Sequence, residues 1–455
     1  MSEWGAALFV GARAGDLDAS AERARPRGRT GVVPTRRRIE SCLSGPVFIA
    51  VGLAFVAAGC GAATGPQSAP VSSLPLPATS GSPAPPAPPP PEGLGVPTGG
   101  WKTDFSRHTV PLSEITSGGP GKDGIPALDA PEFVTVETVV GWLEAHEPVV
   151  ELTVAGDSRA YPLQILIWHE IVNDTVGGTP VAVTFCPLCN TAIVFDRRLG
   201  GRVLDFGTTG NLRNSDLVMY DRQTETWWQQ FGGEAIVGAL AGERLRLLPA
   251  RIVAWRDFAR DHPGGRVLSR DTGYDRAYGQ NPYTGYDDVN SPPFFPAANP
   301  DDTSLLPKER VALVERGDEV VVIPFSALSE RKRIRFTLAG EELEAVWVPG
   351  VRSALDSSDI AAGSKVGSAL IRDVATGKTV VYDEPFWFSV AAFRPDARIV
   401  RRERLSALEL EGGLPRRPSE SADADRGPIG RRWRRDWGTR GTESLQGERL
   451  CTGSA

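Results

Sequence analysis

The feature that most constrains this chain is that its apolar residues come in short runs, each bounded by Gly, Asp or Asn, instead of in long helical periods. Short runs rich in β-branched and aromatic residues are typical of strands. Helical spacing is brief, at residues 136–145 and 255–262. The pattern predicts a mainly β fold, a β-rich α+β architecture in which antiparallel hairpins form one compact domain with a few short helices. The candidate strands are residues 181–185, 192–195, 203–206, 217–220, 311–314, 320–323, 335–338 and 379–382.

These runs are confined to residues 101–402, and the flanking segments have a different composition. Residues 61–100 are rich in Pro, Ser, Ala and Gly, which favours extended conformations and leaves little apolar surface to bury, so a disordered linker is predicted. Residues 403–455 are rich in Arg, Glu, Gly and Ser without apolar periodicity, which predicts a disordered tail. Residues 1–33 are interpreted as a non-native or disordered extension.

Residues 34–60 have the layout of a secretory signal. Arg36, Arg37 and Arg38 precede an apolar run at 46–59, which ends in small residues before Cys60. Fourteen residues rise only about 21 Å as a helix, against a hydrocarbon core of about 30 Å, which favours a cleaved signal over a permanent span. Cys60 is the candidate lipidation site, and the expected location is the cell envelope, as an extracytoplasmic, membrane-anchored lipoprotein. Lipoprotein signals prefer Leu where Ala57 stands, so an ordinary cleaved signal is the alternative.

The charge balance argues against nucleic acid as a partner. Residues 101–402 hold 32 Lys and Arg against 41 Asp and Glu, a net charge of −9. Binding to a phosphate backbone requires clustered basic residues, and this segment has no basic stripe. A membrane contacted through the lipid anchor, a small ligand, a metal ion or a protein is the expected partner.

The main chemical motif is C-P-L-C at Cys186 and Cys189, between the candidate strands at 181–185 and 192–195. Two sulfurs at this spacing can converge on one point. They can form a reversible disulfide, share a thiophilic metal ion, or form a permanent structural crosslink, and the motif alone does not distinguish these.

A hairpin centred on Gly177 and Gly178 connects this motif to a histidine. If Val176 faces Thr179, the register places His169 opposite Cys186. A protonated imidazole beside a thiol stabilises the thiolate, the form that attacks disulfides or binds metal. The alternative is that residues 161–171 form a short helix after Pro162, with His169 hydrogen-bonded in the core.

A second cluster is a tyrosine-rich segment, whose Gly and Pro content excludes regular structure. Its polar side chains suit a loop that lines a ligand pocket. The alternative is a long loop that is held in place by its Tyr hydroxyls. The candidate ligand residues are Tyr274, Tyr278, Tyr283, Tyr286, Asp287 and Asp288.

Residues 168–197, W-H-E-I-V-N-D-T-V-G-G-T-P-V-A-V-T-F-C-P-L-C-N-T-A-I-V-F-D-R, resemble the bacterial domain of unknown function 3179 family. The resemblance continues through G-G-P-G-K-D-G-I-P at 118–126, V-M-Y-D-R-Q-T-E-T-W-W-Q-Q at 218–230 and W-F-S-V-A-A-F-R-P-D at 387–396, and so covers roughly 101–400. It implies a domain and no settled activity. Members described as selenoproteins carry selenocysteine in the C-x-x-C region, which implies redox chemistry at Cys186 and Cys189. Asn190 stands where relatives often have Gly.

Three hypotheses follow. In the first, the protein is a thiol-disulfide oxidoreductase or redox sensor that needs no cofactor, with Cys186, Cys189 and His169 as catalytic residues and a redox protein as partner. In the second, the same three residues bind Zn²⁺ or Cu(I), and a metal-delivery protein is the partner. In the third, the protein is a non-enzymatic binding module whose C-P-L-C forms a structural disulfide.

Overall fold

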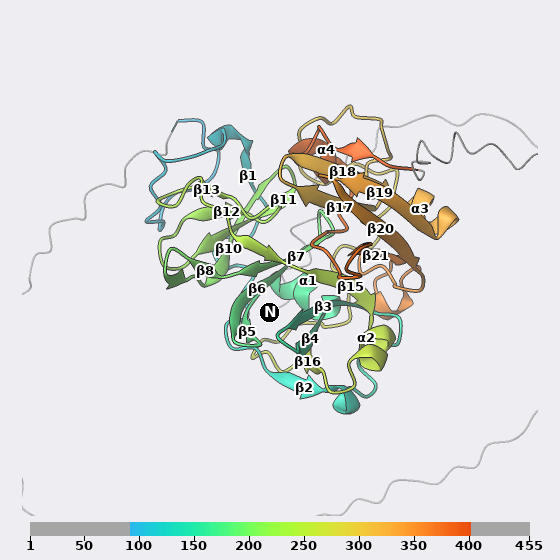
Figure 1. Ribbon diagram of the computed structural model, residues 1–455. Coiled ribbons are helices and arrows are strands. Elements are labelled where there is room, and N and C mark those ends of the chain that lie inside the picture. Colours follow the sequence, from blue (N-terminus) through green and yellow to red (C-terminus); the bar gives the residue numbers. More distant parts are fainter. Residues whose placement is uncertain (1–91, 402–455) are drawn as a thin grey trace, which may run out of the picture. The chain divides into compact units, whose positions relative to one another are not determined.

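The computed structural model describes residues 92–401, which contain the β-rich part of the chain (Figure 1). The segments 1–33, 34–60 with Cys60, nearly all of the linker 61–100 and the tail 403–455 lie outside the described residues. The expectation of a mainly β fold with antiparallel hairpins and a few short helices is confirmed. No helix among residues 92–401 is long and apolar enough to cross a membrane.

The four-stranded antiparallel sheet that carries the C-P-L-C motif follows the order β14-β7-β6-β5. Its β5–β6 hairpin turns at Gly177 and Gly178, which have φ of 52° and 76°. A Cβ at Gly177 would lie 2.1 Å from the carbonyl oxygen of Val154, so both the backbone angle and the space require glycine. The predicted register is confirmed from Val176↔Thr179 to Ile171↔Thr184. The strands are β5 (Ile171–Val176), β6 (Thr179–Cys186), β7 (Thr191–Asp196) and β14 (Arg246–Leu248).

The expectation that His169 faces Cys186 across this hairpin is wrong, because β5 begins only at Ile171. His169 is the last residue of helix α1 (Leu163–His169), which follows Pro162. Proline supplies helical φ and lacks the N–H that a first turn leaves unpaired, so it suits a helix start. Glu170 then ends the helix with φ of 58°. The alternative of a short helix after Pro162 is the correct one.

Two five-stranded sheets flank this region, in the orders β1-β10-β11-β12-β13 and β15-β3-β4-β16-β2. All of their pairings are antiparallel except β16 with β4. The first contains β1 (Ile115–Ser117), β10 (Phe206–Arg213), β11 (Asp216–Asp221), β12 (Trp227–Gln229) and β13 (Ala235–Val237), and the second β2 (Phe133–Thr135), β3 (Pro148–Val154), β4 (Asp157–Pro162), β15 (Ala250–Ala254) and β16 (Arg266–Leu268).

A short ribbon between β7 and β10 pairs β8 (Arg198–Leu199) with β9 (Arg202–Val203). The later part of the chain forms two three-stranded sheets. The two sheets are β17 (Val311–Arg316), β18 (Glu319–Pro324) and β22 (Arg398–Ile399), and β19 (Arg333–Leu338), β20 (Glu341–Val348) and β21 (Ser368–Asp373). The other helices are α2 (Trp255–Asp261), α3 (Phe325–Arg331) and α4 (Trp387–Phe393), with 3₁₀ turns η1 (Leu112–Glu114), η2 (Val136–Thr138) and η3 (Ile360–Ala362).

Three local expectations were wrong. Residues 136–145 form only the 3₁₀ turn η2, because Gly141 adopts φ of 76° and interrupts any helix. Residues 203–206 are divided between β9 and β10. Residues 379–382 form no strand, since Thr379 makes only an isolated bridge to Arg372.

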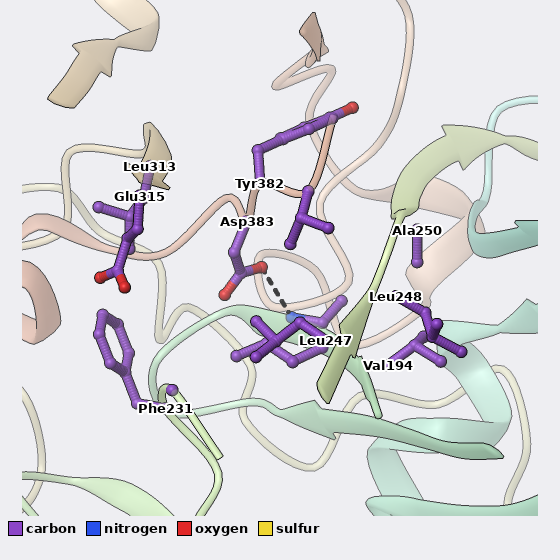
Figure 2. A pocket seen from close by; sticks show the side chains of 13 residues that line it. Val194, Phe231, Leu247, Leu248, Ala250, Leu313, Glu315, Tyr382 and Asp383 are labelled. Carbon is purple, nitrogen blue, oxygen red and sulfur yellow. Dashed lines mark hydrogen bonds between the residues drawn. The ribbon is translucent and has the colours of Figure 1, made fainter. Parts of the chain in front are cut away.

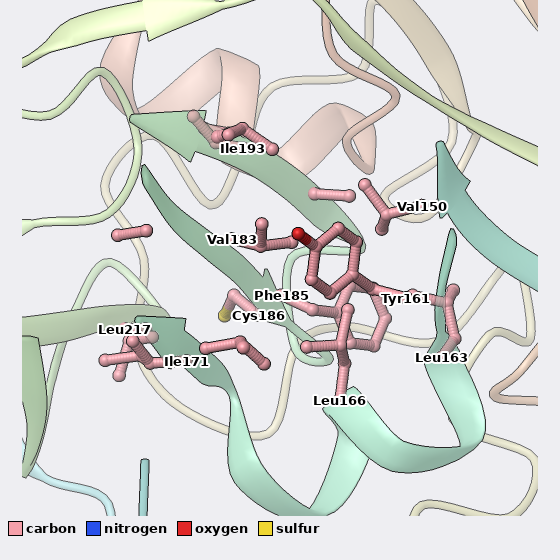
Figure 3. Packing of buried hydrophobic residues seen from close by; sticks show 14 of the residues in the cluster. Val150, Tyr161, Leu163, Leu166, Ile171, Val183, Phe185, Cys186, Ile193 and Leu217 are labelled. Atoms are coloured by element: carbon pink, nitrogen blue, oxygen red, sulfur yellow. The ribbon is translucent and has the colours of Figure 1, made fainter. Parts of the chain in front are cut away.

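The largest hydrophobic cluster surrounds the C-P-L-C turn. Figure 3 shows Cys186 among Phe185, Ile171 and Leu217, with Tyr161 and Leu166 packed on the neighbouring side chains. The turn is therefore a core element.

The turn itself depends on Asn190, which precedes β7. Asn190 has φ of 57°, and its side-chain amide donates to the carbonyl of Glu384 at 2.7 Å. Asn and Gly are the residues that adopt this left-handed conformation most readily. Asn190 therefore suits the backbone conformation of the turn and adds a hydrogen bond to Glu384.

We expect Asn190→Gly to lower the free energy of unfolding by about 1 kcal/mol through loss of the hydrogen bond. Asn190→Ala should cost about 1 kcal/mol more than Gly, because Ala also strains the left-handed backbone. Urea denaturation of both variants measures this. The matched control is the exposed Asn290, which has no positive φ. At position 290 the Ala variant should be at least as stable as the Gly variant. If Asn190→Ala is as stable as Asn190→Gly, residue 190 does not have the left-handed backbone conformation.

Candidate functional site

The two cysteines of C-P-L-C lie at the end of β6 and in the turn that follows it, with exposed fractions of 1% and 0%. Both are free thiols that point toward one backbone carbonyl. Cys189 Sγ lies 3.3 Å from the oxygen of Ser215, and Cys186 Sγ lies 3.9 Å from the same oxygen. The two sulfurs therefore converge, as the spacing predicts.

The third member of this cluster is Asp216, the first residue of β11. A carboxylate oxygen of Asp216 and the two sulfurs all lie within 4.8 Å of one another. The β10–β11 turn brings it there through Asn214 and Ser215, which have φ of 53° and 61°. Arg213 pairs with Asp216, so these two residues form a two-residue hairpin turn, a geometry that requires positive φ at both central positions.

One oxygen of Asp216 lacks a hydrogen-bond partner. Oδ2 accepts from the side-chain amide of Gln229 and from the backbone N–H of Phe231, the latter at 2.9 Å. Oδ1 is buried without a partner among the described residues. Burial raises the pKa of Asp216 to about 6, and the Phe231 N–H, the Gln229 amide and the two nearby thiols oppose that rise. The thiols are the nearest potential donors, and S–H groups are weak donors, so this buried acceptor is poorly satisfied and an added cation would stabilise the site.

The thiols are also held in their neutral form. Burial is the largest cause that raises the pKa of Cys186, and the charges of Asp216 and Glu170 add to it. Burial raises the pKa of Cys189 well above the ordinary value, and the neighbouring Cys186 and Asp216 raise it further. Without a cation both sulfurs are therefore poor nucleophiles at neutral pH.

Further buried carboxyl groups surround the turn. Glu170, which is 8% exposed, has its pKa raised to about 8 by burial and by the charge of Asp216. Burial likewise raises the pKa of Asp383 to about 7 and that of Glu384 to about 8. Ser389 of α4 adds a buried hydroxyl without a partner, and it lies near enough to Cys189 to lower that thiol's pKa. Arg310 partly offsets the rise at Glu384, whereas no cation is among the causes of the shifts at Glu170 and Asp383.

His169 lies in a different environment from this cluster. Its Nδ1 lies 2.8 Å from the carbonyl of Pro126, and its Nε2 lies 2.6 Å from the hydroxyl of Tyr278. The carbonyl can only accept, so Nδ1 carries the hydrogen and Tyr278 donates to Nε2. Burial lowers the pKa of His169 to about 4, so the ring is neutral. His169 is not part of the group of ligand atoms formed by Cys186, Cys189 and Asp216.

The tyrosine-rich segment lies partly against the C-P-L-C turn. The hydroxyl of Tyr286 donates to the carbonyl of Leu188 at 2.9 Å, inside the turn. Tyr283 packs on the surrounding apolar cluster, and burial followed by the charges of Glu170 and Cys186 raises its pKa. Tyr278 bonds to His169, whereas Tyr274 is 45% exposed.

The two acids at the end of the segment differ in their surroundings. Asp287 pairs with Arg310 at 3.1 Å and accepts from Ser353, so its carboxylate is already compensated. Asp288 is exposed and accepts from the backbone of Asn290. The segment thus brings Tyr283 and Tyr286 to the cysteines, while its acids lie in other contacts.

The sequence interpretation omitted Asp216, Glu170 and Ser389. Glu170 directly follows His169, so its proximity could have been recognised from the hairpin register. Asp216 directly precedes the apolar run at 217–220, which is a usable signal for a buried acid. Ser389 lies in a helix that follows Cys189 by 200 positions and carried no signal of its own.

A family model described as Protein of unknown function (DUF3179) matches residues 122–397, which is more than half of the chain. Comparisons with curated proteins and with solved structures gave no match. The matched residues contain the C-P-L-C turn, Asp216, Glu170 and Ser389. This chain belongs to the DUF3179 family of proteins of unknown function.

Proposed function

We propose that this protein binds a thiophilic metal ion at Cys186, Cys189 and Asp216, and that Zn²⁺ is the favoured ion. The observation that carries the proposal is the convergence of two thiols and an unpaired, buried carboxylate oxygen within 4.8 Å. Asp216 replaces His169 in the ligand set that the sequence suggested.

The donor set favours zinc over copper. Thiolates suit both Zn²⁺ and Cu(I), but a carboxylate is a hard ligand that suits zinc better than the soft Cu(I) ion. Three protein ligands leave one position of a tetrahedral zinc ion for water or another ligand, as in catalytic rather than structural sites. Glu170 is a nearby acid whose charge raises the pKa of Cys186 and whose own pKa is raised by the charge of Asp216.

Metal binding would also resolve the electrostatic problem of the site. The three ligands must lose their protons to bind, and a divalent cation repays the cost of burying their negative charges. The raised pKa values of Asp216 and both thiols are those of a site that lacks a positive charge.

Thiol-disulfide exchange is the second candidate, supported by the convergence of both sulfurs on Ser215. Its catalytic step needs an accessible thiolate. The burial of both thiols and the absence of His169 from their cluster favour the metal proposal over it.

The first prediction concerns the metal-free protein. Above pH 4 an unfolded Asp216 loses its proton, whereas the folded residue retains it to about pH 6. Stability should therefore be highest below pH 4, fall as pH rises to about 6, and then level off for this group. Asp216 should lower the free energy of unfolding by roughly 3 kcal/mol over this range, because its pKa rises from 3.8 to about 6 and each pKa unit corresponds to about 1.4 kcal/mol.

Asp216→Asn removes this titration while its side-chain oxygen can still accept from Gln229 and Phe231. The variant should show a smaller loss of stability between pH 4 and 6 in urea denaturation. Glu330→Gln, at an exposed position of α3, is the control and should follow the wild-type curve. Identical curves for Asp216→Asn and wild type would show that burial of this acid carries no such cost.

The second prediction concerns zinc. The reduced, metal-free protein should take up one Zn²⁺ per chain and gain thermal stability, because the ion binds only the folded state. Cys189→Ser and Asp216→Asn should weaken binding by more than about 100-fold, since loss of an outer-shell partner alone costs about 10- to 100-fold. Competition with a chromogenic chelator and elemental analysis measure both quantities.

His169→Gln is the matched control, because His169 bonds to Pro126 and Tyr278 and lies outside the ligand group. This variant should bind zinc with unchanged affinity. If it loses as much zinc affinity as Cys189→Ser does, His169 is a ligand, as the sequence predicted. No zinc uptake together with a Cys186–Cys189 disulfide that equilibrates with glutathione would favour the redox candidate. A disulfide that resists glutathione would favour a structural crosslink.

The proposal includes a location at the cell envelope, supported by the signal-like residues 34–60. Cells that are fed an alkyne-tagged fatty acid should label the wild type and retain it in the membrane fraction. Cys60→Ala should abolish the label and release the protein, whereas Cys451→Ala, the control, should change neither. Persistent labelling of the Cys60→Ala variant would exclude Cys60 as the lipidation site, and an unlabelled wild type would indicate an ordinary cleaved signal.

A further inference from the structure

A pocket of about 240 Å³ borders strands β7 and β14 of the sheet that carries the C-P-L-C motif. Its walls come from β7, β14 and β15, from β17, and from the segment that ends at Asp383. Figure 2 shows the apolar side chains of Val194, Leu247 and Leu248 facing Phe231 and Leu313 around this space. Most of the lining is therefore hydrocarbon.

Asp383 places a carboxyl group in this apolar wall. Its Oδ1 accepts from the backbone N–H of Ala192 at 3.0 Å and from that of Glu384 at 2.8 Å. Its Oδ2 is buried and has no hydrogen-bond partner among residues 92–401. In Figure 2 the unbonded oxygen points to the side on which Phe231 and Glu315 lie. A donor on a bound molecule is what this oxygen lacks.

The other acid of the pocket is already compensated. Glu315 is half-buried and pairs with Arg394 at 2.7 Å. No Lys, Arg or His within the described residues forms an ion pair with Asp383. The pocket therefore presents one carboxyl group without a counter-charge, surrounded by apolar walls.

The geometry points to a binding site for a small amphipathic amine, with an apolar ring between Phe231 and Leu247 and a protonated nitrogen that donates to Asp383 Oδ2. A cavity of about 150 Å³ lined by Leu, Ile and Phe holds benzene, so about 240 Å³ accommodates a ring with a short aminoalkyl arm. Apolar walls strengthen a charge-assisted hydrogen bond because they exclude water. This inference does not depend on metal binding.

The test compares 2-phenylethylamine with 2-phenylethanol, which has the same shape but carries no positive charge. Titration calorimetry on the full protein should show at least about tenfold tighter binding of the amine, which corresponds to about 1.4 kcal/mol. Intermolecular NMR contacts should run from the phenyl ring to Phe231 and Leu247. Equal affinity for the two compounds, no binding of the amine at millimolar concentration, or contacts to other residues would overturn the proposal.

Asp383→Asn tests the acid directly, since its side-chain oxygen still accepts from Ala192 and Glu384 while an NH₂ group replaces Oδ2. It should reduce the amine affinity at least about tenfold and leave that of the alcohol unchanged. Glu315→Gln is the matched control, and its effect on the amine should stay below about threefold because Glu315 is already paired. If Asp383→Asn folds and binds the amine as tightly as the wild type, Asp383 does not bind the amine and the proposal is wrong.

Discussion

Burial of acidic and thiol groups around the C-P-L-C turn is the constraint on which the rest of the structure depends. Asp216, Cys186 and Cys189 are each at most 1% exposed, and Glu170 is 8% exposed. Water cannot solvate these groups, so the fold must supply partners or keep the groups neutral. It supplies the Phe231 N–H and the Gln229 amide to one oxygen of Asp216 and leaves the other oxygen unpaired.

The two proposed sites share structural elements. Phe231 donates its backbone N–H to Asp216, while its ring lines the apolar pocket. Ala192 follows the cysteine turn by three residues in the chain, and its backbone N–H donates to Asp383. The charge of Asp216 also contributes to the raised pKa of Asp383. A cation bound at either acid would therefore ease ionisation of the other through the same low-dielectric region.

The sequence predicted those features that depend on local chemistry. Gly177 and Gly178 define the turn, and alternation along β5 and β6 defines the register, so that hairpin was predicted correctly. His169 was misplaced because residues 163–167 are apolar throughout, and a short apolar run fits a buried strand or a buried helix equally well. Asp216 could not be placed beside the cysteines, because it lies in a different sheet from β6 and local patterns do not fix how two sheets pack.

The same burial separates the candidate roles of the cysteines on energetic grounds. A structural disulfide is satisfied by an apolar environment and has no need of neighbouring acids. Keeping Asp216 with a pKa near 6 costs the folded state about 3 kcal/mol at neutral pH, a large share of the 5–15 kcal/mol that typically stabilises a domain. A cation coordinated by the sulfurs and Asp216 offsets that cost, whereas a disulfide leaves it in place. The acid beside the cysteines, more than the C-x-x-C spacing itself, therefore supports a metal ion as the physiological occupant of this site.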